Sequence, residues 1–207
     1  MISFAVIIGH TGKQRGSLAV TPISEHEYDY CHKLGFAIAE NLVDDDIEVC
    51  VFQKDDGYKN VYDAVNQYNP SCAVELHFNS FPGGAATGTE TLFTDKNFKN
   101  PRLAELLQEK ICFVLDREGS TNRGIKHIAE YIQDKQIIID RGYDAIKYCS
   151  VPCCIIEPFF GNNTNDSALG FRRFLNLATS ISDGMKDFER WSFSNIILGK
   201  YKDIENK

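Results

Sequence analysis

Largely apolar runs and amphipathic stretches alternate along this chain of 207 residues. Apolar runs occupy residues 2–8, 72–78 and 151–156, a pattern typical of strands that are covered on both faces of a sheet. Residues 47–52 alternate in part between apolar and polar side chains, and 90–94 is a further short segment of this kind. Both segments predict additional strands.

Segments with apolar side chains at helical spacing lie between and after these strands. They predict helices over residues 25–43, 60–68, 102–116 and 166–188. Ser24 is expected to cap the first helix, and Glu27, three residues later, would complete a capping box. Residues 117–147 mix polar and apolar positions, so they predict a loop-rich insertion with short elements.

Strands that alternate with helices predict an α/β fold. We expect a single domain with a twisted, mostly parallel sheet of about six strands flanked by helices. The helical pattern ends before residue 190, and the segment after Trp191 is polar. Residues 1–190 are therefore predicted to form the domain, and 191–207 a loosely attached polar C-terminal tail.

Charge and cysteine content exclude several classes of protein. The net charge is −7, whereas nucleic-acid binding needs clustered Lys and Arg, so we expect no nucleic-acid partner. The seven cysteines are scattered, which indicates reduced core residues of a protein that folds in the cytoplasm. The first residues lack the basic region of a signal peptide, and no apolar stretch is long enough to insert into a membrane.

Polar side chains stand where three of the predicted strands end. These residues are His10, His77 and Glu157, and a fourth polar residue, Glu27, lies in the first turn of the first helix. Because the carboxyl ends of parallel strands share one edge of a sheet, we expect all four to meet there. Each has an ordinary structural explanation by itself, but their convergence is hard to obtain by packing alone, since burying unpaired polar groups is costly.

These residue types suit a catalytic zinc site. Such a site takes three ligands from imidazole and carboxylate groups and leaves one position open for water. We assign His10, Glu27 and His77 as the ligands of Zn²⁺. Glu157 would act as general acid and base, because a second carboxylate can take the proton of the water and pass it to a leaving amine.

Four segments in order along the chain carry a family resemblance. They are IIGHTGKQRGS at 7–17, SEHEYDYCHKLGFAIAENL at 24–42, VELHFNS at 74–80 and VPCCIIEPFFGNNTND at 151–166. Through them the chain resembles the zinc-dependent N-acetylmuramoyl-L-alanine amidases of the amidase-3 type. This family is found in bacterial cell-wall hydrolases and phage endolysins. The resemblance extends to about residue 188, so it covers most of the predicted domain.

The resemblance implies a reaction and a set of roles. It implies one zinc ion held by His10, a glutamate and His77, with Glu157, before Pro-Phe, as the catalytic residue. The expected reaction is hydrolysis of the amide bond between N-acetylmuramic acid and L-alanine. Peptidoglycan, or its muropeptides, is therefore the expected partner. Asn79 is expected to orient His77 or to hydrogen-bond the substrate, although it suits a simple turn equally well.

Two glutamates compete for the middle ligand position. The family form is a glutamate followed by aromatic-Asp-aromatic-Asn, and EYDYC from Glu27 fits it best, with Cys31 where Asn is usual. A ligand at Glu27 also leaves apolar residues on the core face of the helix. A ligand at Glu25 would place Lys33 and Glu40 on that face, which is costly. We therefore favour Glu27.

Three alternative functions are also compatible with the sequence. Cys154 as nucleophile with His77 as base would make a thiol enzyme, but Cys154 lies inside an apolar strand. A zinc peptidase or carboxypeptidase would cut another bond of the stem peptide, and a non-catalytic peptidoglycan-binding module would hold wall fragments intact. Chelation, alkylation and the identity of the bond that is cut separate these hypotheses.

The sequence also bears on how the protein would reach the cell wall. No wall-anchoring module is recognisable in the residues after 190, and we expect an acidic chain not to adhere to an anionic wall. We expect a wall-targeting domain or partner outside this chain. The route expected from the family resemblance is synthesis in the cytoplasm, followed by release through a phage holin.

Overall fold

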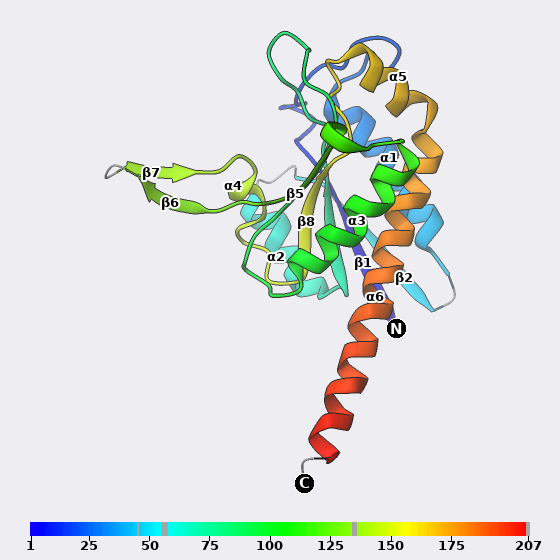
Figure 1. Ribbon diagram of the computed structural model, residues 1–207, viewed down its shortest axis with the longest axis vertical. Coiled ribbons are helices and arrows are strands. Elements are labelled where there is room, and N and C mark those ends of the chain that lie inside the picture. The colour runs from blue at the N-terminus through cyan, green and yellow to red at the C-terminus, as the bar shows by residue number, and fades with distance from the viewer. Residues whose placement is uncertain (45, 55–57, 134–135, 206–207) are drawn as a thin grey trace.

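The computed structural model describes residues 1–44, 46–54, 58–133 and 136–205 (Figure 1). Its main sheet has six strands in the order β2-β1-β3-β8-β4-β5. Their bounds are β1 Ile2–Ile8, β2 Ile47–Phe52, β3 Cys72–Leu76, β4 Thr89–Phe93, β5 Asn122–His127 and β8 Cys153–Glu157. Strands β2, β1, β3 and β8 run parallel, β4 is antiparallel to β8, and β5 is parallel to β4. The predicted α/β domain with a mostly parallel sheet of about six strands is confirmed.

Helices cover both faces of this sheet (Figure 1). Their bounds are α1 Glu27–Leu42, α2 Tyr58–Tyr68, α3 Asn100–Val114, α4 Tyr143–Ile146, α5 Thr164–Arg172 and α6 Phe174–Glu205. Helices α1, α3 and α6 pack on one face, and α2 and α4 pack on the other. Strand β1 is buried between them, with Val6 and Ile8 facing the first layer and Ala5 and Ile7 the second. None of the helices within the described ranges is long and apolar enough to cross a membrane.

The region 117–147 holds more regular structure than the sequence pattern indicated. It contains β5, the hairpin of β6 (Glu130–Gln133) and β7 (Gln136–Ile139), and α4. Strand β5 lies at the edge of the sheet opposite β2 and is largely polar, so it lacks the apolar run that marks the buried strands. The β6–β7 hairpin projects away from the domain (Figure 1).

The C-terminal helix also differs from its predicted bounds. The segment expected to be one helix over 166–188 is two helices, α5 and α6, which are separated at Arg173. Helix α6 continues to Glu205, and its C-terminal part extends beyond the sheet (Figure 1). The predicted tail after Trp191 is therefore helical over the described residues.

The predicted capping of α1 is wrong. The N-cap of this helix is His26, and Ser24 has a left-handed backbone with a φ of 51°. The backbone of His26 pairs with that of Leu18 in a short antiparallel bridge, which keeps the chain extended until the helix begins at Glu27. The carboxylate of Glu27 is consequently not used as a capping group and faces the edge of the sheet.

Candidate metal and catalytic site

Three neighbouring parallel strands carry polar side chains to one edge of the sheet. His10 lies just after β1, His77 directly follows β3, and Glu157 is the last residue of β8. Glu27 is the first residue of α1, which begins at the same edge. The parallel direction of these strands explains why residues distant in sequence meet here.

The side chains of His10, Glu27 and His77 form one cluster. Nε2 of His10 lies 3.0 Å from Oε2 of Glu27, and Nδ1 of His77 lies 2.8 Å from Oε1 of Glu27. One potential ligand atom from each residue falls within 4.8 Å of the others. The two imidazole rings meet edge to face, with centroids 4.9 Å apart. This set of donors can hold one metal ion of the zinc type.

Glu27 is held as an anion by its surroundings. Its carboxylate accepts hydrogen bonds from the backbone N–H groups of Ser17 and Phe78, each at 3.2 Å. Burial by itself raises the pKa of Glu27, but its interactions with His10 and His77 outweigh burial and lower that pKa to about 2. A carboxylate that stays ionised in a buried position is suited to bind a cation.

Two glycines allow the backbone to approach this cluster closely. Gly16 has a φ of 72°, and a Cβ there would lie 2.6 Å from Nε2 of His10 and 2.8 Å from Oε2 of Glu27. A Cβ on Gly9 would lie 2.8 Å from Nε2 of His77. A side chain at Gly16 would occupy the space beside the donor atoms of His10 and Glu27, and one at Gly9 would displace the ring of His77.

A second, fully buried carboxylate stands behind His77. Oε1 of Glu75 lies 2.7 Å from Nε2 of His77, and the same carboxylate pairs with Lys54. Burial raises the pKa of Glu75, but Lys54 and then His77 outweigh it and lower that pKa to about 2. For His77, burial lowers the pKa, while its bonds to Glu27 and Glu75 prevail and raise it to about 9 in the metal-free protein.

Glu157 has a different environment from these two carboxylates. It is buried, and its Oε2 lies 3.0 Å from Nη2 of Arg141. Burial raises the pKa of Glu157, and the nearby Arg141 opposes that effect only in part. The same guanidinium pairs with Glu90 at 2.9 Å, and Glu90 is also bound by Arg123 at 2.7 Å. Glu157 therefore retains a proton more readily than Glu27 or Glu75.

Asn79 lies with the Glu157 side of the site. Its amide donates to Glu90 at 2.7 Å, and its carbonyl oxygen accepts from Arg141 at 3.0 Å and from the backbone of Ser80 at 2.8 Å. Within the described part of the chain, these bonds lead away from His77. The structure therefore places Asn79 where it supports Arg141, and not where it orients a predicted metal ligand.

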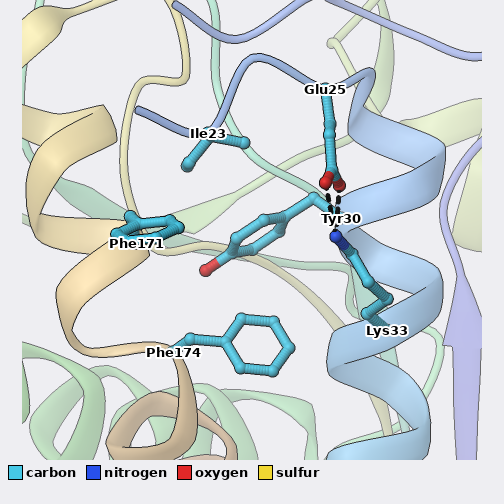
Figure 2. A pocket seen from close by; sticks show the side chains of 6 residues that line it. All are labelled: Ile23, Glu25, Tyr30, Lys33, Phe171 and Phe174. Carbon is cyan, nitrogen blue, oxygen red and sulfur yellow. Dashed lines mark hydrogen bonds and ion pairs between the residues drawn. The ribbon is translucent and has the colours of Figure 1, made fainter. Parts of the chain in front are cut away.

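Glu25 lies in a separate pocket (Figure 2). This pocket, of about 270 Å³, is lined by Ile23, Glu25, Tyr30, Lys33, Phe171 and Phe174. The carboxylate of Glu25 forms an ion pair with Lys33 at 2.5 Å, and it joins neither histidine of the cluster. Of the two glutamates that compete for the ligand position, the geometry favours Glu27.

The cysteines offer no activated thiol. All seven are free, and six, including Cys154, are buried. Cys154 packs into the apolar layer on the α1 side of the sheet, and burial raises the pKa of its thiol far above the usual range. A nucleophilic cysteine needs a lowered pKa, so this environment argues against the thiol-enzyme hypothesis.

A pocket of about 390 Å³ opens onto the cluster. Its walls include Ser17, Ser80 and Arg141, which come from three separate segments of the chain. His10, Glu27, His77 and Glu157 also line it. A molecule in this pocket would contact the predicted metal ligands and the predicted acid/base together.

Sequence reasoning missed the roles of Glu75 and Arg141. The sequence does point to a role for Glu75, because a charged residue inside a buried strand requires a partner. Strand alternation places Glu75 on the same face of the sheet as His77. No sequence pattern pointed to Arg141, because it follows the β6–β7 hairpin and no periodic pattern specified the course of that hairpin. Its contact with Glu157 depends on how that hairpin folds back to the sheet edge.

Comparison with known proteins gives the family. The sequence profile of the amidase-3 family, described as N-acetylmuramoyl-L-alanine amidase, matches residues 5–187. Among curated proteins, no sequence matches this chain significantly.

Solved structures with the same fold include several catalytic domains. The catalytic domain of CwlV, an N-acetylmuramoyl-L-alanine amidase from Bacillus (Paenibacillus) polymyxa var. colistinus, has a TM-score of 0.74 at 20% identity, over 91% of this chain and 98% of that one. An N-acetylmuramoyl-L-alanine amidase from Clostridium difficile 630 has a TM-score of 0.73 at 22% identity, covering 90% and 96%. The catalytic domain of the CD27L endolysin, which targets Clostridia difficile, has a TM-score of 0.70 at 21% identity, over 90% of this chain and 98% of that one.

Proposed function

This chain belongs to the N-acetylmuramoyl-L-alanine amidase family, and from that premise we propose that it hydrolyses the amide bond between N-acetylmuramic acid and L-alanine of peptidoglycan with zinc as its cofactor. We propose His10, Glu27 and His77 as the ligands of the metal. The observation that carries this proposal is the convergence of three potential ligand atoms within 4.8 Å at the wall of a pocket that also contains Glu157.

The chemistry of the donors fits zinc. Neutral imidazole and carboxylate are its usual ligands at catalytic sites, and three of them leave a coordination position for water or substrate. Gly16 keeps the space beside the donor atoms of His10 and Glu27 free of a side chain. When bound, zinc supplies a Lewis acid that polarises a carbonyl group and makes water acidic enough to react near neutral pH.

Glu157 is proposed to move the proton. As a carboxylate it accepts a proton from the attacking water, and as a carboxylic acid it gives that proton to the departing alanine nitrogen. Both steps need a group that can hold a proton, and burial favours the protonated form of Glu157. The bond from Arg141 to Oε2 holds this carboxyl group in place at the wall of the pocket.

Digestion of purified peptidoglycan tests the proposal. Mass spectrometry should find stem peptides with a free L-alanine amine and glycan strands without peptide. A strong chelator should stop their release, and added zinc should restore it. Cleavage elsewhere in the stem peptide would make the chain a peptidase, and bound fragments without a new amine would make it a binding module. Loss of activity with an alkylating agent, but not with a chelator, would favour a thiol enzyme.

We also propose that the chain reaches the wall after release through a phage holin. The support is the likeness in fold to the catalytic domain of the CD27L endolysin. Expression in a susceptible host with a holin should cause lysis, whereas expression without one should not. Lysis that is independent of the holin would reject this route.

A further inference from the structure

The imidazole of His77 lies between two carboxylates. On one side, Nδ1 is 2.8 Å from Oε1 of Glu27, within the predicted metal cluster. On the other side, Nε2 is 2.7 Å from Oε1 of Glu75. Glu75 precedes His77 by two positions at the end of β3, so strand alternation points both side chains to the same face of the sheet.

Glu75 is held rigidly by groups from two other elements. Its carboxylate pairs with the ammonium of Lys54, just beyond β2, and its Oε2 accepts a hydrogen bond from the hydroxyl of Tyr62 on α2. The side chains of Lys54, Tyr62 and Glu75 are almost completely buried. This network therefore defines the position of Oε1 opposite His77.

Fold stability alone does not account for this network. A buried ion pair often contributes no more than apolar side chains of similar volume, because removing two charges from water is costly. Metal-ligating histidines, in contrast, almost always donate their second ring N–H to a carboxylate or carbonyl, which sets the tautomer and the direction of the ring. Glu75 occupies the position of that acceptor.

We propose that Glu75 is a positioning residue for the metal site. It accepts a hydrogen bond from Nε2–H of His77 and thereby leaves Nδ1 as the nitrogen that binds the metal. Lys54 and Tyr62 hold Glu75 in the required orientation. This inference rests on the proposed function, because it assumes that His10, Glu27 and His77 bind an ion.

The unmodified chain provides the first test. It is labelled with nitrogen-15 at histidine, loaded with a spin-active cadmium isotope as a zinc substitute, and studied by NMR. We expect scalar coupling from the metal to Nδ1 of His77 and a proton on Nε2. Coupling to Nε2 would overturn the role of Glu75 while leaving the metal site intact. Failure to bind either zinc or cadmium would reject the metal site, and with it this inference.

A double variant tests the same point through affinity. Glu75→Gln with Lys54→Met removes both charges, so neither is left buried without its partner. Thermal melting of the metal-free protein checks folding, and competition with a chromophoric chelator measures zinc affinity. We expect affinity to fall about 10- to 100-fold. Native affinity in a folded double variant would overturn the proposal.

Tyr62→Phe is the matched control, since it keeps the contact between Glu75 and His77 and removes only the hydroxyl. Its loss of zinc affinity should be smaller than that of the double variant, and an equal loss would contradict a specific role of Glu75. If the double variant does not fold, the NMR experiment on the unmodified chain decides.

Discussion

At the residue scale, the site contains carboxyl groups whose pKa values are shifted in opposite directions. The surroundings of Glu27 and Glu75 lower the pKa of each to about 2, so both stay ionised. Burial raises the pKa of Glu157, which favours its protonated form. Carboxyl groups whose environments push their pKa values apart are typical of sites that separate charge binding from proton transfer. The proposed roles of ligand and acid/base follow this division.

Glu157→Gln tests the proton-transfer role. Glutamine has nearly the same shape as glutamate but cannot accept the proton, so we expect kcat to fall by about 10²- to 10⁴-fold. Zinc content should stay at the native level, because Glu157 is not one of the proposed ligands. Release of peptide amine from peptidoglycan measures kcat, and metal analysis measures zinc. Hydrolysis at the native rate would show that another group moves the proton.

Arg141→Gln tests how Glu157 is tuned. The guanidinium lowers the pKa of Glu157, so its removal should raise that pKa further. Because the base must be deprotonated to accept a proton, the acid limb of the pH profile of kcat/KM should move to higher pH. Arg141→Lys keeps the positive charge and should move the limb less. An unchanged profile, or a shift to lower pH in Arg141→Gln, would contradict this role.

At the scale of elements, the loop between β1 and α1 brings two ligands together. It follows the strand that ends before His10 and leads to Glu27 at the start of the helix. Gly16 lies against both side chains and has a left-handed backbone. The loop can therefore pass over the cluster only without a side chain at this position.

Gly16→Ala should damage both the loop and the metal site. The left-handed backbone costs an alanine roughly 1–2 kcal/mol in the free energy of unfolding. The new Cβ would also displace the imidazole of His10, so zinc affinity should fall. Denaturant unfolding of the metal-free protein and chelator competition measure the two effects.

Gly12→Ala is the control from the same loop, because a Cβ at Gly12 has no neighbour within 4 Å among the residues that the structure describes. Its unfolding free energy should stay within about 0.5 kcal/mol of the native value. Equal loss of zinc affinity in Gly12→Ala and Gly16→Ala would show that general loop flexibility, and not the close approach of Gly16, controls the site.

At the scale of the whole molecule, the apolar layer formed by α1, α3 and α6 supports one face of the sheet, and its interior lies away from the site. Leu107 on α3 is fully buried in the apolar layer that also contains α1 and α6. The four site residues lie at the carboxyl edge of the sheet: His10 and His77 follow strands, Glu157 ends β8, and Glu27 begins α1. Stability and metal binding should therefore be separable.

Leu107→Ala tests this separation. The cavity should lower the free energy of unfolding by about 2–5 kcal/mol. Zinc affinity of the folded protein should remain native. Phe113→Ala on the same helix removes a side chain that is 86% exposed, so it should change stability by no more than about 0.5 kcal/mol. A loss of zinc affinity in Leu107→Ala would mean that the helical layer and the site are coupled.

Much of the fold and part of the site could be predicted from local patterns. The runs that became β1, β3 and β8 are buried on both faces, so their apolar character was visible without any neighbour. The positions of His10, His77 and Glu157 at strand ends followed from the same pattern. The choice of Glu27 over Glu25 followed from the family form that begins at Glu27 and from the apolar face of the helix. In contrast, the edge strand β5 is polar and gave little signal.

The linear order of residues by itself determined the α/β class, the buried strands and the set of polar residues that end them. The reason is that burial of a strand or helix imposes a pattern of apolar positions that can be recognised within the segment itself. Only the tertiary structure decided which charged groups face one another. The contacts of Glu75 with Lys54 and Tyr62, and of Arg141 with Glu157, join separate elements of the chain. Such pairs depend on distances across the folded molecule, and these distances have no periodic signature in sequence.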